Sequence, residues 1–201
     1  MIFSDNIKSI LESMWPTLLI MTVVAFSMRL TYIIRSKEKF VLYKDIMAYL
    51  FAIYILCLFY VVTFQDVSWS TSNFIPFKEI LRYEIGSKMF FKNVIGNAVM
   101  FVPFGFFVAY FLKLDKVRFS LLITFITSLT IELTQLVIGR VFDIDDLLLN
   151  LVGGTIGFIC YKLIHNIRVK LPEFLKKDYI YNIIMVLLLF GVIFYIVKVI
   201  S

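Results

Sequence analysis

A short polar stretch, residues 131–150, carries most of the side chains in this chain that could do chemistry. Glu132 lies inside an otherwise apolar run, and that run is followed within a few residues by one arginine and three aspartates. A charged side chain within a membrane-spanning segment costs roughly 3 kcal/mol or more, so such residues usually face a protein interior or a watered cavity. We therefore expect a functional site in this stretch.

Polar groups from three predicted helices should meet at this site. At about 1.5 Å per residue, Asn97 and Asn150 lie roughly 5 Å inside their spans and Glu132 roughly 9 Å inside its own. Gln135 follows Glu132 by three residues and shares its helix face. The predicted ligand-binding residues of this outward-opening pocket are Asn97, Glu132, Gln135, Arg140, Asp143, Asp145, Asp146 and Asn150.

The elements that position these residues are predicted to be membrane-spanning helices. The chain has 201 residues, of which 61% are hydrophobic, and its mean hydropathy is +0.93. This composition excludes an ordinary soluble domain and predicts an all-α, polytopic helical bundle. Six stretches approach the roughly 20 apolar residues that a span requires: 15–34, 46–64, 94–112, 117–138, 147–164 and 179–199.

The remaining segments divide the chain into three parts. Residues 1–72 hold two spans and the start of a loop, residues 73–164 a three-span core, and residues 165–201 a loop and the last span. Within the long loop 65–93, residues 73–82 predict a cap followed by a short amphipathic helix at the membrane interface.

The distribution of basic residues predicts the orientation. With both termini outside, twelve of the 20 Lys and Arg residues fall in inner loops, seven fall outside, and Arg29 lies within the first span. This excess favours a multi-pass protein with both termini outside. The positive charge is thereby explained by topology, and nothing in the sequence indicates nucleic-acid binding.

Several site residues have structural alternatives. Glu132 is expected either to form a buried ion pair, with Arg140, Arg82 or another loop cation as partner, or to act as a ligand contact or proton acceptor. Asp145 and Asp146 begin a helix, where carboxylates cap free backbone N–H groups. Three aspartates in four residues are a weak signal for a metal, and no cofactor is indicated. Glycines 153, 154 and 157 have a spacing typical of close helix packing in membranes.

Taken together, these motifs resemble the VanZ-like family, named for a membrane protein of teicoplanin resistance. The resemblance covers about residues 73–161. Its elements are residues 73–77, Asn97 with residues 101–106, Glu132 with Gln135, and residues 139–153 with Arg140, Asp143, Asp145, Asp146 and Asn150. It implies a bacterial cell-membrane protein whose founding relative lowers susceptibility to lipid-bearing glycopeptides, but it supplies no reaction or ligand.

Three functions are compatible with these residues. The first is a non-enzymatic envelope protein that binds an amphiphile, either a lipid-linked envelope precursor or a lipoglycopeptide, with membrane lipids around it. The second is an intramembrane transferase or hydrolase, with Glu132 or Asp146 as general base and Arg140 stabilising developing negative charge. The third is a structural partner in a larger envelope complex. The oligomeric state is left open.

Overall fold

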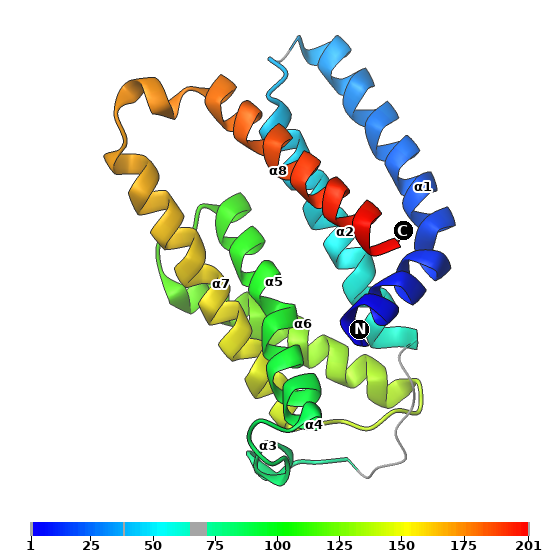
Figure 1. Ribbon diagram of the computed structural model, residues 1–201. Coiled ribbons are helices and arrows are strands. Elements are labelled where there is room, and N and C mark those ends of the chain that lie inside the picture. Colours follow the sequence, from blue (N-terminus) through cyan, green and yellow to red (C-terminus); the bar gives the residue numbers. More distant parts are fainter. Residues whose placement is uncertain (1, 38, 65–71, 201) are drawn as a thin grey trace. The chain divides into compact units, whose positions relative to one another are not determined.

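A computed structural model describes residues 2–37, 39–64 and 72–200 of the chain, and these residues are almost entirely helical (Figure 1). Residues 65–71, the first part of the predicted loop 65–93, lie outside the described residues. The elements are α1 (Ile2–Ser36), α2 (Leu42–Phe64), α3 (Lys78–Arg82), α4 (Lys88–Phe90), a π-helical turn (Phe91–Ile95), α5 (Gly96–Leu112), α6 (Val117–Val137), α7 (Ile144–Lys170), a 3₁₀ turn (Glu173–Lys176) and α8 (Asp178–Ile200). The predicted all-α class is confirmed.

Within the described residues, five helical segments are long and apolar enough to cross a membrane: Glu12–Ser36, Leu42–Val61, Lys88–Leu112, Val117–Val137 and Ile144–Lys170. In α8, the described apolar part, Asp178–Phe194, is shorter. The 27 residues of α7 reach about 40 Å at about 1.5 Å per residue. The short apolar run 147–164 is therefore part of a full-length helix rather than a re-entrant one.

The chain divides into two compact units, and the first contains residues 1–57 and 171–201. Its helices are joined by polar contacts within otherwise apolar surfaces. The Arg29 guanidinium pairs with the Asp45 carboxylate at 2.7 Å, which links α1 to α2. The backbone N–H of Tyr43 donates to the Asn182 side chain at 2.9 Å, which links α2 to α8.

The second unit, residues 58–170, contains the predicted core 73–164, and its centre is a close contact between α5 and α7. A Cβ atom added to Gly153 would lie 2.0 Å from the Ala98 carbonyl oxygen, and one added to Gly157 would lie 2.1 Å from that of Val102. The two backbones touch at these glycines. Only glycine permits this approach, because the Cβ atom of any other residue would collide with the backbone of α5. The predicted packing role of this glycine stretch is confirmed.

One face of α6 is buried and polar. Ser120, Thr124, Ser128 and Glu132 recur at every fourth residue, and each has at most 2% of its surface exposed. This spacing places them on one side of the helix. Thr124 packs against α7, since a Cβ on Gly154 would lie 2.5 Å from its hydroxyl oxygen. The small hydroxyl residues therefore let α6 approach α7, and they lead along the helix to the buried carboxylate of Glu132.

Candidate functional site

A segment that ends with α3, which we call the strap (residues 72–82), is joined to the turn between α6 and α7. The Asn73 N–H donates to the Phe142 carbonyl at 2.8 Å, and the Ile144 N–H donates to the Asn73 carbonyl at 3.0 Å. The rings of Phe74 and Phe142 stack with centroids 5.2 Å apart. This isolated parallel bridge joins parts of the chain about 70 residues apart and fixes the strap over the start of α7.

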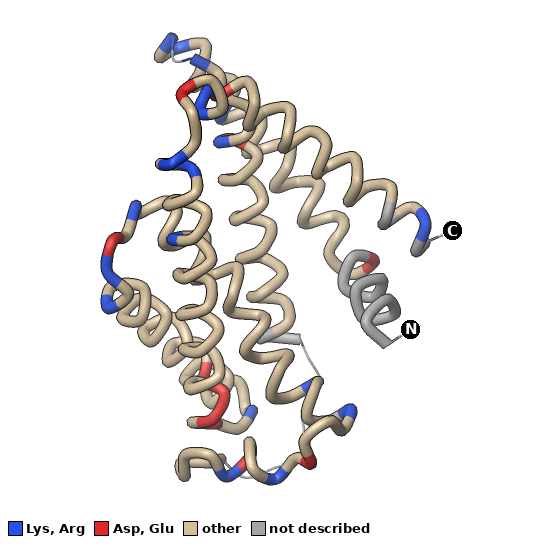
Figure 2. Tube along the Cα trace, turned by 60° about the vertical axis from the view of Figure 1, so that its left-hand side comes forward, with Lys and Arg blue, Asp and Glu red and all other residues tan. Residues whose placement is uncertain are grey.

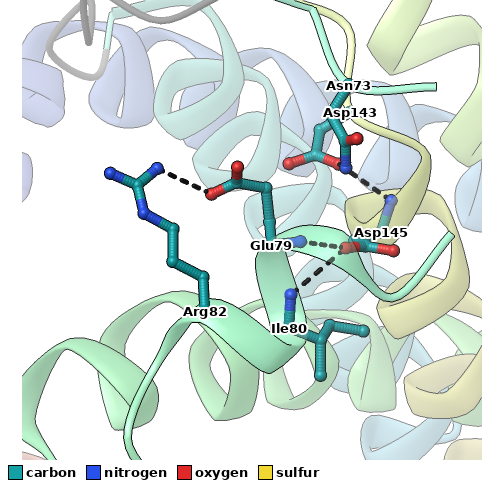
Figure 3. Close-up of polar contacts among 6 residues, drawn as sticks. All are labelled: Asn73, Glu79, Ile80, Arg82, Asp143 and Asp145. Atoms are coloured by element: carbon teal, nitrogen blue, oxygen red, sulfur yellow. Dashed lines mark hydrogen bonds and ion pairs between the residues drawn. The ribbon is translucent and has the colours of Figure 1, made fainter. Parts of the chain in front are cut away.

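Asp145 provides the second attachment of the strap. Its carboxylate accepts a hydrogen bond from the backbone N–H of Phe77. It also accepts from the N–H groups of Glu79 at 2.7 Å and Ile80 at 3.2 Å (Figure 3). Phe77 adopts a left-handed backbone conformation (φ 65°), which is costly for a residue with a side chain. Asp145 is 1% exposed and holds this conformation by satisfying the free N–H groups at the start of α3.

These contacts correct two predictions about helix caps. Asn73 was expected to cap the short helix, but its side chain accepts from the Ile75 N–H at 3.1 Å and donates to Asp143 at 2.9 Å. A cap on their own helix was the structural alternative for Asp145 and Asp146, but Asp145 caps α3 instead. The cap of α7 is Asp143, whose carboxylate accepts from the Asp145 N–H at 2.9 Å. Asp145 thus satisfies backbone donors of a helix more than 60 residues earlier in the chain, and Asp143 satisfies a donor at the start of α7.

Asp143 precedes α7 and is partly removed from water. Burial raises the pKa of its carboxyl above the ordinary value of 3.8, and the hydrogen bonds from Asp145 and Asn73 oppose this only in part. The folded protein therefore holds the Asp143 proton more tightly than the unfolded chain does.

A pH dependence follows from this shift. As the pH rises from below 3.8 through the raised pKa, ionised Asp143 should cost the folded state stability. Asp143→Asn keeps an acceptor oxygen for Asn73 and the Asp145 N–H but cannot ionise. We expect the melting temperature of wild type to fall relative to Asp143→Asn over this window, measured by thermal unfolding in detergent. A difference in melting temperature between wild type and Asp143→Asn that stays constant with pH would contradict this prediction.

Glu132 and Asn150, both predicted to face a ligand, are directed into the protein. The Glu132 carboxylate is 2% exposed and accepts from the Asp143 N–H at 3.0 Å. The Asn150 amide donates to the Ser128 hydroxyl at 2.9 Å. Glu132 thereby supports the turn between α6 and α7, and Asn150 links α7 to α6.

Six of the eight predicted residues line one cavity of about 570 Å³ in the second unit. They are Asn97, Gln135, Arg140, Asp143, Asp145 and Asp146. The Asn97 amide donates to the Asp146 carboxylate, which joins α5 to α7 within the cavity wall. At the end of α6, Gly139 takes a positive φ of 85° and the Arg140 N–H donates to the Gln135 carbonyl at 2.8 Å. This helix-ending motif places Gln135 and Arg140 at the cavity.

The cavity also contains polar residues that were absent from the predicted set. The strap and its continuation contribute Glu79, Arg82 and Tyr83, together with Asn73, and the π-helical turn contributes Asn93. The Arg82 guanidinium pairs with Glu79 at 3.1 Å (Figure 3). Asn93 precedes Asn97 by four residues, a spacing that places both on one helix face and was readable from the sequence. No local sequence pattern predicts that the strap residues reach the cavity.

Most of the described acidic residues of the second unit lie at the end of the unit that carries the strap and the turn between α6 and α7 (Figure 2). Within the described part of the chain, no group of three or more His, Cys, Asp or Glu residues is arranged to hold a metal ion. The arrangement offers hydrogen-bond donors and acceptors of mixed charge.

Comparison with protein families agrees with this architecture. A family model described as VanZ/LLP1 matches residues 46–165, more than half of the chain, including the strap, the cavity and the α5–α7 contact. Searches of curated proteins and of solved structures gave no match. The chain is therefore a membrane protein of the VanZ/LLP1 family.

Proposed function

We propose that this protein binds the polar headgroup of an amphiphile in the cavity beneath the strap, without catalysing a reaction on it. The observation that carries the proposal is a cavity of about 570 Å³, lined by charged and amide side chains, in a protein with membrane-spanning helices. Its volume lies within the range of roughly 300–1,000 Å³ typical of small-molecule sites.

The outer surface of the strap and its continuation supports a ligand that comes from lipid. Leu81 and Ile85 are 81% and 86% exposed, and Phe74, Ile75 and Met89 are exposed as well. Large apolar side chains on an amphipathic segment with Lys and Arg are typical of elements that lie in the membrane interface. The strap then lies at the level of the lipid headgroups, with its polar residues towards the cavity.

Two of the carboxylates that line the cavity have structural roles. Asp145 and Asp143 are engaged in holding the strap and capping α7. Arg140 lies in the turn between α6 and α7 and also lines the cavity. A guanidinium forms bidentate hydrogen bonds with phosphate or carboxylate, so Arg140 is the proposed contact for an anionic group of the ligand.

Variants of Arg140 test this proposal. We expect the protein purified from bacterial membranes to retain a specific lipid-linked molecule, and Arg140→Ala to lose it, because the anionic group loses its partner. Arg140→Lys should retain an intermediate amount, since it keeps the charge but not the bidentate geometry. The measurement is mass spectrometry of co-purified lipids, with Arg118→Ala as the control at the other end of α6.

Equal retention by wild type, Arg140→Lys and Arg140→Ala would remove this role from Arg140. Retention of only bulk membrane lipids by wild type would remove the proposed function.

The family resemblance extends the proposal to the bacterial cell envelope. With both termini outside, the cavity opens outward, where a lipid-linked envelope precursor or the lipid-bearing core of a teicoplanin-type antibiotic reaches it. A sensitive bacterium that expresses the wild-type chain should become less susceptible to teicoplanin but not to vancomycin. Arg140→Ala and Glu132→Gln, at matched membrane levels, should abolish the difference.

The alternative function is an intramembrane transferase or hydrolase. Asp146 and Arg140 line the same cavity, which supports Asp146 as the base, whereas Glu132 lies outside the lining. In that case Asp146→Asn abolishes turnover of a lipid-linked substrate while binding survives. A purely structural role in a larger complex instead predicts that Glu132→Gln lowers the amount of folded protein in step with any loss of function.

A further inference from the structure

We infer that the cavity selects a headgroup made mainly of uncharged sugar, so that the ligand is a glycolipid or another lipid-linked glycan whose anionic linkage, where it has one, lies at Arg140. This inference rests on the proposed function and names the chemical class of the headgroup.

The first argument is the number of side-chain amides. Asn93, Asn97 and Gln135 line the cavity from α6 and from the continuous helical segment Lys88–Leu112. A side-chain amide offers both donors and acceptors. A hydroxyl group also donates and accepts, so a wall of amides pairs well with a headgroup that carries several hydroxyls on a ring.

The second argument concerns Asp146. The Asn97 amide occupies one of its carboxylate oxygens, and the cavity lies against the pair. A carboxylate held by an amide is fixed in orientation, and its remaining lone pairs accept hydrogen bonds from ligand O–H groups. Asp143 and Asp145 serve the strap, so Asp146 is the carboxylate placed to accept from a sugar hydroxyl.

The third argument is the charge of the lining. It contains four carboxylates, on Glu79, Asp143, Asp145 and Asp146, against two guanidinium groups, on Arg82 and Arg140. Arg82 is already paired with Glu79 at 3.1 Å. Like charges repel in a partly buried site, and the carboxylates of the lining outnumber its guanidinium groups, so the cavity disfavours a headgroup made mainly of phosphates. A neutral sugar bears no such cost.

Tyr83 is the last of the residues that we propose to contact the sugar. It lies in the lining next to Arg82 and is half-buried. A tyrosine ring presents an apolar face and a polar hydroxyl. That face suits the C–H side of a sugar ring, while the amides and Asp146 meet its hydroxyls.

Binding of defined lipids tests the inference. The purified full chain in phosphatidylcholine nanodiscs is titrated with three fluorescent probes of identical acyl chains: diglucosyldiacylglycerol, diacylglycerol and phosphatidylglycerol. We expect diglucosyldiacylglycerol to bind at least about tenfold more tightly than the other two, because only it offers several hydroxyls to the amides. Asn97→Leu and Gln135→Leu should each remove most of that preference.

Two controls keep the result interpretable. Asn166→Leu removes an exposed amide near the other end of α7 and should leave the preference unchanged. Melting curves identify variants that fail to fold, and Gln135, which is half-buried, provides a variant independent of the Asn97–Asp146 contact.

Sugar-dependent binding that survives in both amide variants overturns the inference, and three further outcomes decide the question. Sugar-dependent binding lost in both amide variants supports the inference. Preferential binding of phosphatidylglycerol that depends on Arg140 overturns the inference and leaves the proposed function standing. Equal binding of all three probes, insensitive to Asn97, Gln135 and Arg140, overturns both.

Discussion

Gly157→Ala is expected to cost the protein most of its stability, because α5 and α7 touch at this residue. The new Cβ would lie 2.1 Å from the Val102 carbonyl oxygen and 2.6 Å from the Phe106 nitrogen, both backbone atoms that cannot turn aside. Overpacking of this kind costs about 3 kcal/mol, and more when a backbone must move. The measurement is the melting temperature and the yield of monodisperse protein in detergent.

Gly191→Ala is the matched control for this change. It also lies within an apolar helix, α8, but an added Cβ meets nothing within 4 Å. Alanine is favoured over glycine in a helix by about 1 kcal/mol, so this variant should be at least as stable as wild type. Equal melting temperatures for Gly157→Ala and wild type would show that the two helices are not in backbone contact.

Asp145→Asn is expected to release the strap while leaving the spans folded. Asparagine is nearly the same size, but its NH₂ group cannot accept, so some N–H groups of Phe77, Glu79 and Ile80 lose their partner. Loss of charge-assisted bonds costs roughly 2 kcal/mol. Limited trypsin digestion should then cut faster after Lys78 and Arg82, and the amide hydrogens of residues 77–80 should exchange faster.

The control for this experiment is Asp115→Asn. Asp115 pairs with Lys162 at 2.9 Å, but its side chain is exposed and lies in the loop between α5 and α6. Its removal should leave cleavage after Lys78 and Arg82 unchanged. A wild-type digestion rate in Asp145→Asn would mean that the backbone bridge at Asn73 holds the strap without help from Asp145.

Much of the fold was predictable because its determinants are local. Apolar runs of span length identify the helices, and the spacing of Gly153 and Gly157 identifies the close contact. The distribution of roles among the acidic residues was not predictable in this way. Asp145 serves donors 65 to 68 residues earlier in the chain, and no local pattern specifies such a partner.

The orientation of Glu132 shows a second limit. Sequence spacing placed Glu132 and Gln135 on one helix face, but three residues still leave about 60° between them. Because of this angle, the two side chains have different surroundings. Gln135 lines the cavity, while Glu132 is buried against the turn that carries Asp143. Rotation of α6 about its axis is set by its packing on α7, which depends on small residues such as Thr124 and Gly154.

The attachment of the strap also imposes an order on biosynthesis. Residues 77–80 leave the ribosome before Asp145 has been made, and at about 5–20 residues per second the delay is at least several seconds. During that interval two further helices, α5 and α6, must be synthesised and inserted. The cavity therefore closes only after α7 arrives, and a chain truncated before residue 145 presents the strap to insertion factors and proteases with its N–H groups unsatisfied.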